Sequence, residues 1–105
     1  MTYPEDPRTA PSIRWGVLAP GGIAHAFAEA VLGHTRSTVA AVGSRSLARA
    51  EQFASRYDVP AAYGSYEELV QDDTVEAVYV ASPHSEHRDH ALLAIAAGKH
   101  VLVEK

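Results

Sequence analysis

The amino-acid sequence predicts an α/β protein with one doubly wound parallel sheet, and two observations support this prediction. From residue 13 onwards, short apolar runs of strand length alternate with longer segments of helical periodicity. The short runs are apolar on both faces, which is typical of strands that lie between two layers of helices. With 105 residues, 47% of them hydrophobic and 21% charged, the chain has the length and composition of one globular domain.

The first strand is expected over residues 13–19, "IRWGVLA", which is bounded by a proline and two glycines. An alanine-rich helix is expected over 23–33, where it ends at a glycine. The second strand, "STVAAVGS", spans 37–44 and is rich in apolar and β-branched residues. A second helix is expected over 46–57, with apolar residues at helical spacing and Ser46 as its N-cap.

The third strand is short and is expected over residues 60–64. A short helix follows it, with a capping box formed by Ser65 and Glu68, in which each side chain satisfies a backbone N–H of the other residue. The fourth strand, "VEAVYVAS" at 75–82, is the strongest strand pattern in the chain, and Pro83 ends it.

A fourth long segment, residues 85–97, is expected to be helical, and Gly98 provides its C-terminal cap. Its buried side is expected to be apolar and to consist of Ala91, Leu92, Ile95 and Ala96. The last strand, "HVLVE", is expected over 100–104.

Residues 1–12 are expected to be a flexible leader, and residues 13–105 the folded domain. The leader has acidic residues and three prolines, unlike a secretory signal. No apolar run approaches the roughly 20 residues of a membrane-spanning helix, and the net charge of -4 argues against nucleic acid or an anionic membrane as partner. The absence of cysteine excludes disulfides and thiolate ligands, and it is compatible with the cytoplasmic location that we expect.

Ligands of such sheets bind beyond the carboxyl ends of the strands, where the first loop is "APGGIA". Gly21 and Gly22 allow the backbone to approach a pyrophosphate, while Ile23 and Ala24 begin a helix whose positive end would face the phosphates. Ala19 stands where the dinucleotide-binding fingerprint has glycine, and a positive φ there would disfavour alanine by about 1 kcal/mol. This loop predicts a nucleotide site, and the alternative is a simple turn between strand and helix.

The loop after the second strand, "VGSRS", has no acid where an NAD-preferring site places one for the ribose 2′-hydroxyl. Ser44 and Arg45 occupy this place. Because a guanidinium forms paired, charge-assisted hydrogen bonds with phosphate, the loop favours NADP, with NAD as the alternative cofactor. Arg45 could instead be a solvated residue before a helix.

The loops after the fourth and fifth strands also carry polar residues. In "ASPHSEH", Ser82 and Pro83 are candidates to line the nicotinamide end of a cofactor, with His87 one turn into the next helix. Glu104 and Lys105 follow the last strand. The carboxyl ends of parallel strands meet at one edge of a sheet, so we expect these loops to form one site.

The spacing of His84, His87 and His90 raises the alternative of a metal site, since residues at i and i+3 can share a helix face. The third histidine lies roughly 600° around the helix from the first and leaves that face. A metal site is therefore not expected. A catalytic triad of Ser82, His84 and Asp89 is not expected either, because their order and spacing are not those of a nucleophile elbow.

Residues 13–105 resemble the NAD(P)-binding domain of the Gfo/Idh/MocA oxidoreductases through "WGVLAPGGIA", "VGSRSLARAEQFA", "YGSYEELVQDDTVEAVYVASPHSEH" and "AGKHVLVEK". The resemblance implies a Rossmann-like fold. It also implies that "GGIA" holds the pyrophosphate, that Ser44 and Arg45 hold the adenosine ribose end, and that residues 82–87, His84 included, border the nicotinamide ribose.

The closing "EK" resembles the start of the family's Glu-Lys-Pro motif. The resemblance implies that Glu104 contacts the nicotinamide ribose and that Lys105 serves catalysis or substrate binding. Two features depart from the family pattern. Ala19 replaces a glycine, and the chain ends before the proline and before the family's second sheet-bearing domain, which supplies the substrate pocket.

We therefore expect the NAD(P)-binding portion of an oxidoreductase that transfers hydride between a nicotinamide cofactor and a polyol, sugar or related carbonyl compound. The substrate would bind only with the second domain, and the 105-residue chain alone is expected to be inactive. The alternatives are a nucleotide-binding module without catalysis, and a fragment that self-associates through the exposed edge of its last strand.

Overall fold

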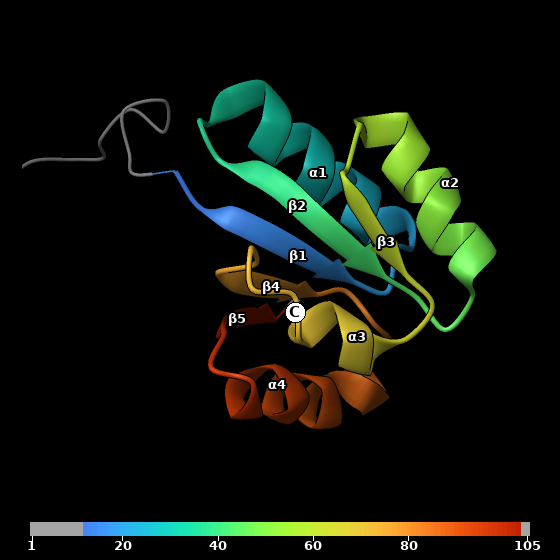
Figure 1. Cartoon of the computed structure of the whole chain (residues 1–105), viewed down its shortest axis with the longest axis vertical. Helices are drawn as coiled ribbons and strands as arrows, with labels where there is room; N and C mark the ends of the chain where they lie inside the picture. The colour runs from blue at the N-terminus through green and yellow to red at the C-terminus, as the bar shows by residue number, and fades with distance from the viewer. Residues whose placement is uncertain (1–11, 104–105) are drawn as a thin grey trace, which may run out of the picture.

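The computed structural model describes residues 12–103, which form a five-stranded parallel sheet with helices on both faces (Figure 1). This confirms the predicted fold class; the leader expected over residues 1–12 lies, except for Ser12, outside the described residues. The strands are β1 (Arg14–Leu18), β2 (Thr38–Gly43), β3 (Ala61–Tyr63), β4 (Ala77–Val80) and β5 (His100–Val103). The helices are α1 (Gly22–His34), α2 (Leu47–Tyr57), α3 (Tyr66–Val70) and α4 (His87–Ala96), and a 3₁₀ turn, η1 (His84–Glu86), precedes α4.

The strand order is β3-β2-β1-β4-β5, with every neighbouring pair parallel. β1 lies at the centre and pairs with both β2 and β4. Leu18 at its end is level with Gly43 of β2 and with Val80 of β4. The chain thus winds outward from β1 first in one direction and then in the other, which is the Rossmann arrangement.

Helices α1 and α2 cover one face of the sheet, and α3 and α4 cover the other (Figure 1). On the first face Val17 packs with Phe53 of α2; on the second, Leu18 packs with Leu69 of α3 and Ala94 of α4. Val17 and Leu18 are neighbours on β1, and both are fully buried because successive strand residues point to opposite faces. Within residues 12–103, the helices are too short or too polar to span a membrane.

Both predicted serine N-caps, those of α2 and α3, are formed. Ser46 caps α2, as predicted, by accepting a hydrogen bond from the Arg49 N–H (3.3 Å). Ser65 caps α3 in the same way through the Glu68 N–H (3.2 Å). The Glu68 carboxylate, however, accepts from the Ser65 hydroxyl (2.9 Å) and not from its N–H. The capping box is therefore formed in one direction only.

The predicted buried side of α4 is wrong. Leu92 and Ile95 are 51% and 57% exposed, Ala96 is exposed and Ala91 half-buried, whereas His90 and Ala94 are buried. From Ala91 to Ala97 the helix is apolar all round, so its pattern does not select one face. Its orientation follows instead from His90, which is buried against the loop after β4.

The predicted glycine cap of α4 is confirmed. Gly98 has φ +82°, and its N–H donates to the Ile95 carbonyl (2.9 Å) while the Lys99 N–H donates to the Ala94 carbonyl (3.0 Å). These two bonds form a Schellman motif, which requires the left-handed conformation that glycine adopts without strain.

Ala19 also has a left-handed backbone, with φ +72°, and it connects β1 to α1. Its N–H donates to the Gly43 carbonyl at the end of β2 (3.0 Å), and its own carbonyl accepts from the Gly21 N–H (2.9 Å) in a tight turn centred on Pro20. The first position of this loop therefore does require a positive φ, and alanine occupies it.

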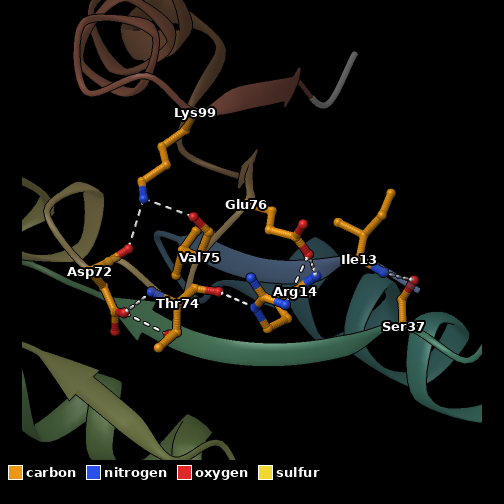
Figure 2. Close-up of polar contacts among 8 residues, drawn as sticks. All are labelled: Ile13, Arg14, Ser37, Asp72, Thr74, Val75, Glu76 and Lys99. Carbon is orange, nitrogen blue, oxygen red and sulfur yellow. Dashed lines mark hydrogen bonds and ion pairs between the residues drawn. The ribbon is translucent and has the colours of Figure 1, made fainter. Parts of the chain in front are cut away.

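The amino ends of the strands are joined by a polar network (Figure 2). Arg14 of β1 donates from Nε to the Thr74 carbonyl (2.6 Å), and its backbone N–H donates to the Glu76 carboxylate (2.9 Å). The Lys99 ammonium donates to the backbone carbonyls of Asp72 (2.8 Å) and Val75 (2.7 Å). The network ties the segment before β4 to β1 on one side and to the start of β5 on the other.

The network contains a second carboxylate besides Glu76, that of Asp72. Its Oδ1 accepts from the Thr74 N–H (2.8 Å) and hydroxyl (2.6 Å), and its Oδ2 accepts from the Tyr63 hydroxyl (2.7 Å). Burial alone would raise the pKa of Asp72. The hydrogen bonds from Thr74 and Tyr63, together with the positive charge of Lys99, outweigh burial and hold this pKa below its ordinary value.

We predict that Asp72→Asn flattens the acid limb of the stability profile. A carboxylate with a lowered folded-state pKa stabilises the fold above its unfolded-state pKa, near 4, and this stabilisation is lost as the pH falls through the folded-state value. At neutral pH the variant should be less stable by about 1 kcal/mol. Urea unfolding between pH 2 and pH 7 measures both effects. Asp73→Asn, at the exposed neighbour, is the control; identical pH profiles for wild type and Asp72→Asn would contradict the prediction.

We further predict that Ala19→Gly stabilises the domain by up to about 1 kcal/mol, because it removes the strain of a left-handed alanine. Glycine also raises the entropy of the unfolded chain, which offsets only part of this stabilisation. Ala26→Gly makes the same chemical change on the exposed face of α1 and should destabilise by about 1 kcal/mol. Thermal or urea unfolding gives both values. A loss of stability in Ala19→Gly as large as that in Ala26→Gly would contradict the expectation.

Candidate functional site

A cleft of about 590 Å³ lies beyond the carboxyl ends of β1, β2 and β4. The loop after β1 contributes Ala19, Pro20 and Gly21; the other walls come from the segments after β2 and β4 and from Tyr66 of α3. Three of the loops in which the sequence predicts ligand-binding residues therefore meet in one place. The switch in winding direction at β1 produces this cleft, because the connections on its two sides leave it open.

A larger hollow of about 770 Å³ lies at the opposite end of the sheet. It is lined by residues near the C-terminal ends of two helices, Leu32 of α1 and Tyr57 of α2. Helix C-termini carry the negative end of the helix dipole, so this hollow is electrostatically unsuited to a phosphate. The smaller cleft is the better candidate for an anionic ligand.

The N-terminus of α1 opens onto the cleft. Gly21 is its N-cap and makes no side-chain cap hydrogen bond, so within the described residues no side chain covers the first N–H groups of the helix. A Cβ added at Gly21 or Gly22 would meet no atom within 4 Å. Free N–H groups, the positive helix end and open space beside them together suit an anion such as a pyrophosphate.

Ile23 and Ala24, the other predicted residues of this loop, point in different directions. Ala24 is fully buried and packs in the same cluster as Val17 of β1, so its small side chain brings helix and strand together. Ile23 is 44% exposed.

After β2, Ser44 is buried, and its backbone N–H donates to the Tyr63 carbonyl (3.0 Å). Its hydroxyl accepts from the Ser46 N–H (3.1 Å) and so shapes the turn into α2. Arg45 has its side chain 67% exposed, but it is not merely solvated. Its guanidinium donates to the Glu86 carboxylate and lies 5.5 Å from the centre of the Tyr66 ring.

The hydrogen bond that Arg45 donates to Glu86, aided by the negative charge of that carboxylate, raises the pKa of Arg45 above the ordinary value. Arg45 is therefore a fixed positive charge at this end of the cleft. Its contacts also show that the arginine is held over one wall of the cleft, between α3 and η1.

Arg49, Tyr66 and Glu86 also line the cleft, and the sequence did not single them out as site residues, although Glu86 lies within the segment 82–87 assigned to the nicotinamide ribose by the resemblance. Arg49 lies one turn into α2, four residues after Arg45, and this spacing is the signal that could have identified it. Tyr66 and Glu86 belong to segments distant from Arg45 in the sequence, and no local pattern links them to it.

The loop after β4 is organised around Ser82, which is buried. His90 Nδ1 lies 2.7 Å from the Ser82 hydroxyl, and His87 Nε2 lies 2.6 Å from the Ser82 carbonyl. His90 also packs edge-on against the Tyr66 ring, with 4.6 Å between ring centres. Burial lowers the pKa of His90, so the neutral imidazole is favoured.

Of the predicted residues in this loop, Ser82 and Pro83 line the cleft, whereas His84 and His87 are not among its lining residues. His84 is exposed and packs edge-on against the His87 ring, with 5.1 Å between centres. The three histidines do not converge, and residues 12–103 contain no group of three His, Cys, Asp or Glu side chains placed to hold a metal ion. Glu104 and Lys105 lie outside the described residues.

Comparison with known proteins identifies the family. Residues 13–105 match the model of the Gfo/Idh/MocA family, described as an oxidoreductase family with an NAD-binding Rossmann fold. Trans-1,2-dihydrobenzene-1,2-diol dehydrogenase of Mus musculus is 46% identical over 96 residues, which cover 90% of this chain and 29% of the relative. D-xylose 1-dehydrogenase (NADP(+)) of Hypocrea jecorina is 42% identical over 106 residues, which cover 90% of this chain and 27% of the relative.

A solved structure of a similar protein has the same fold over this chain. A 3-ketoreductase from Actinomadura kijaniata in complex with NADP and TDP-benzene has a TM-score of 0.83 and 38% sequence identity, covering 90% of this chain and 29% of that one. This chain thus spans less than a third of the length of these relatives. The match over residues 13–105, the parallel sheet order and the cleft at the switch point lead to one conclusion: the chain belongs to the Gfo/Idh/MocA oxidoreductase family and forms its NAD-binding Rossmann domain.

Proposed function

We propose that this domain binds NADP in preference to NAD. The observation that carries the proposal is the pair of arginines, Arg45 and Arg49, at the end of the cleft next to β2, where an NAD-preferring domain has a carboxylate. Two guanidinium groups beside Ser46 suit the dianionic 2′-phosphate of NADP, which they can bind through paired hydrogen bonds. The NADP named with one relative and bound in another supports the same choice.

The pyrophosphate would lie against the first turn of α1. The N–H groups of Gly22 and Ile23 have no cap there, and Gly21 leaves room for the approach of a phosphate. The left-handed Ala19 turns the chain so that α1 starts directly beyond the end of β1. The open N–H groups and the space beside Gly21 support this placement of the pyrophosphate.

The nicotinamide end would lie toward Ser82 and Pro83. The Ser82 hydroxyl and carbonyl already form hydrogen bonds with His90 and His87. We therefore propose that Ser82 and Pro83 shape the wall of the site. Glu104 and Lys105 are assigned, by the family resemblance, to the nicotinamide ribose and to proton transfer with the substrate hydroxyl. The bound cofactor supplies the hydride chemistry.

For the whole protein we propose hydride transfer to or from a polyol, sugar or related carbonyl compound, in line with the diol and xylose named for its relatives. The described residues supply only the cofactor side of this reaction, so we expect the 105-residue chain to bind cofactor without turnover. We further propose a cytoplasmic location, with which the absence of cysteine agrees.

The test is calorimetric titration of the 105-residue chain with NADP and with NAD. Arg45→Ala should weaken NADP binding roughly tenfold, since it removes charge-assisted hydrogen bonds to the phosphate, and should change NAD binding by less than about twofold. Arg36→Ala removes the same charge from an exposed position after α1, at the other end of the sheet, and is the control. Equal affinities for the two cofactors, unchanged by Arg45→Ala, would refute the proposed preference.

A further inference from the structure

Glu86 places a carboxylate inside the cleft, opposite the arginine that we assign to the 2′-phosphate. It is the last residue of η1, its side chain is 31% exposed, and its Oε1 accepts a hydrogen bond from Arg45 Nη2. Arg45 and Glu86 are 41 residues apart in the sequence and come from opposite sides of β1. Their ion pair therefore bridges the loops after β2 and β4 across the cleft.

Contacts with Pro83 and His90 hold Glu86 in this position. The Glu86 N–H donates to the Pro83 carbonyl (2.9 Å), which fixes the turn. His90 Nε2 lies 3.9 Å from Glu86 Oε1, and His90 itself is anchored by the Ser82 hydroxyl. The buried, neutral imidazole does not cancel the charge of Glu86, so the carboxylate retains its full attraction for Arg45.

Tyr66 completes the arrangement. The Arg45 guanidinium lies 5.5 Å from the centre of its ring, and the centre of the His90 ring lies 4.6 Å from it. The aromatic ring restricts Arg45 on one side while Glu86 binds it, so the guanidinium is held in one orientation. An incoming phosphate would meet a guanidinium that already donates from Nη2 to the Glu86 carboxylate, so part of its positive charge is already offset.

From this geometry we infer that Glu86 is a specificity-determining residue that limits the preference for NADP over NAD. The inference rests on the proposed function of Arg45. A 2′-phosphate either takes the place of the carboxylate on the guanidinium or binds beside it and meets its like charge, and both lower the affinity for NADP. NAD has a 2′-hydroxyl, which needs no arginine and can donate to a carboxylate, so its binding does not bear this penalty.

Glu86→Gln tests the inference, because glutamine keeps the shape of the side chain and removes its charge. The 105-residue chain is titrated with NADP and with NAD. We expect NADP to bind about twofold to fivefold more tightly to Glu86→Gln, as an exposed ion pair of ordinary strength implies, and NAD affinity to change less than NADP affinity. The matched control is Glu67→Gln, which removes the same charge from an exposed position on α3 near Arg45 but outside the ion pair.

The double variant, Arg45→Ala with Glu86→Gln, then distinguishes an error in the role of Glu86 from an error in the proposed function of Arg45. If Glu86 acts through Arg45, the gain in NADP affinity caused by Glu86→Gln disappears when Arg45 is already replaced by alanine. If Arg45→Ala weakens NADP binding but Glu86→Gln has no more effect than Glu67→Gln, the inference is wrong and the proposed function stands. If Arg45→Ala leaves NADP binding unchanged, the phosphate assignment itself is wrong and the inference fails with it.

Discussion

Both the two helix layers and the cleft follow from the place of β1 at the centre of the sheet. The chain starts the sheet at its middle strand and then adds β2 and β3 on one side and β4 and β5 on the other. Since crossovers between parallel strands are right-handed, this reversal puts α1 and α2 on one face and α3 and α4 on the opposite face. It also leaves a cleft at the carboxyl ends of β1, β2 and β4 that no crossover covers.

The polar groups at the amino ends of the strands differ in their contacts from those at the carboxyl ends. At the amino ends, the side chains of Arg14 and Lys99 donate to backbone carbonyls, which ties neighbouring segments together (Figure 2). Asp72 accepts there from the Thr74 N–H and from two hydroxyls. At the carboxyl ends, the backbone N–H groups of α1 and the guanidinium of Arg45 face the cleft. Strain is also found at this end, where Ala19 holds a left-handed conformation. A rigid scaffold at one end thus supports a polar site at the other.

The sheet was predictable because buried parallel strands are continuous apolar runs, and Gly98 and Ser46 were predictable because caps are local. For Ala19 the sequence raised a positive φ only as a condition, and the structure, with φ +72°, fulfils it. The buried face of α4 was not predictable, since apolar residues surround that helix and a histidine decides its orientation through a bond to Ser82, eight residues earlier. The pairing of Arg45 with Glu86 was equally hidden, because only the sheet order brings these residues together.

The central claim is that the cofactor lies across the carboxyl ends of β1, β2 and β4. Amide NMR spectra of the ¹⁵N-labelled chain, recorded during titration with NADP, test it most directly. If the cofactor binds there, the backbone N–H groups of Gly22, Ile23 and Arg45 should shift most, with little change at Asp72 and Thr74. Shifts concentrated around Asp72 and Thr74, at the opposite end of the sheet, would contradict it.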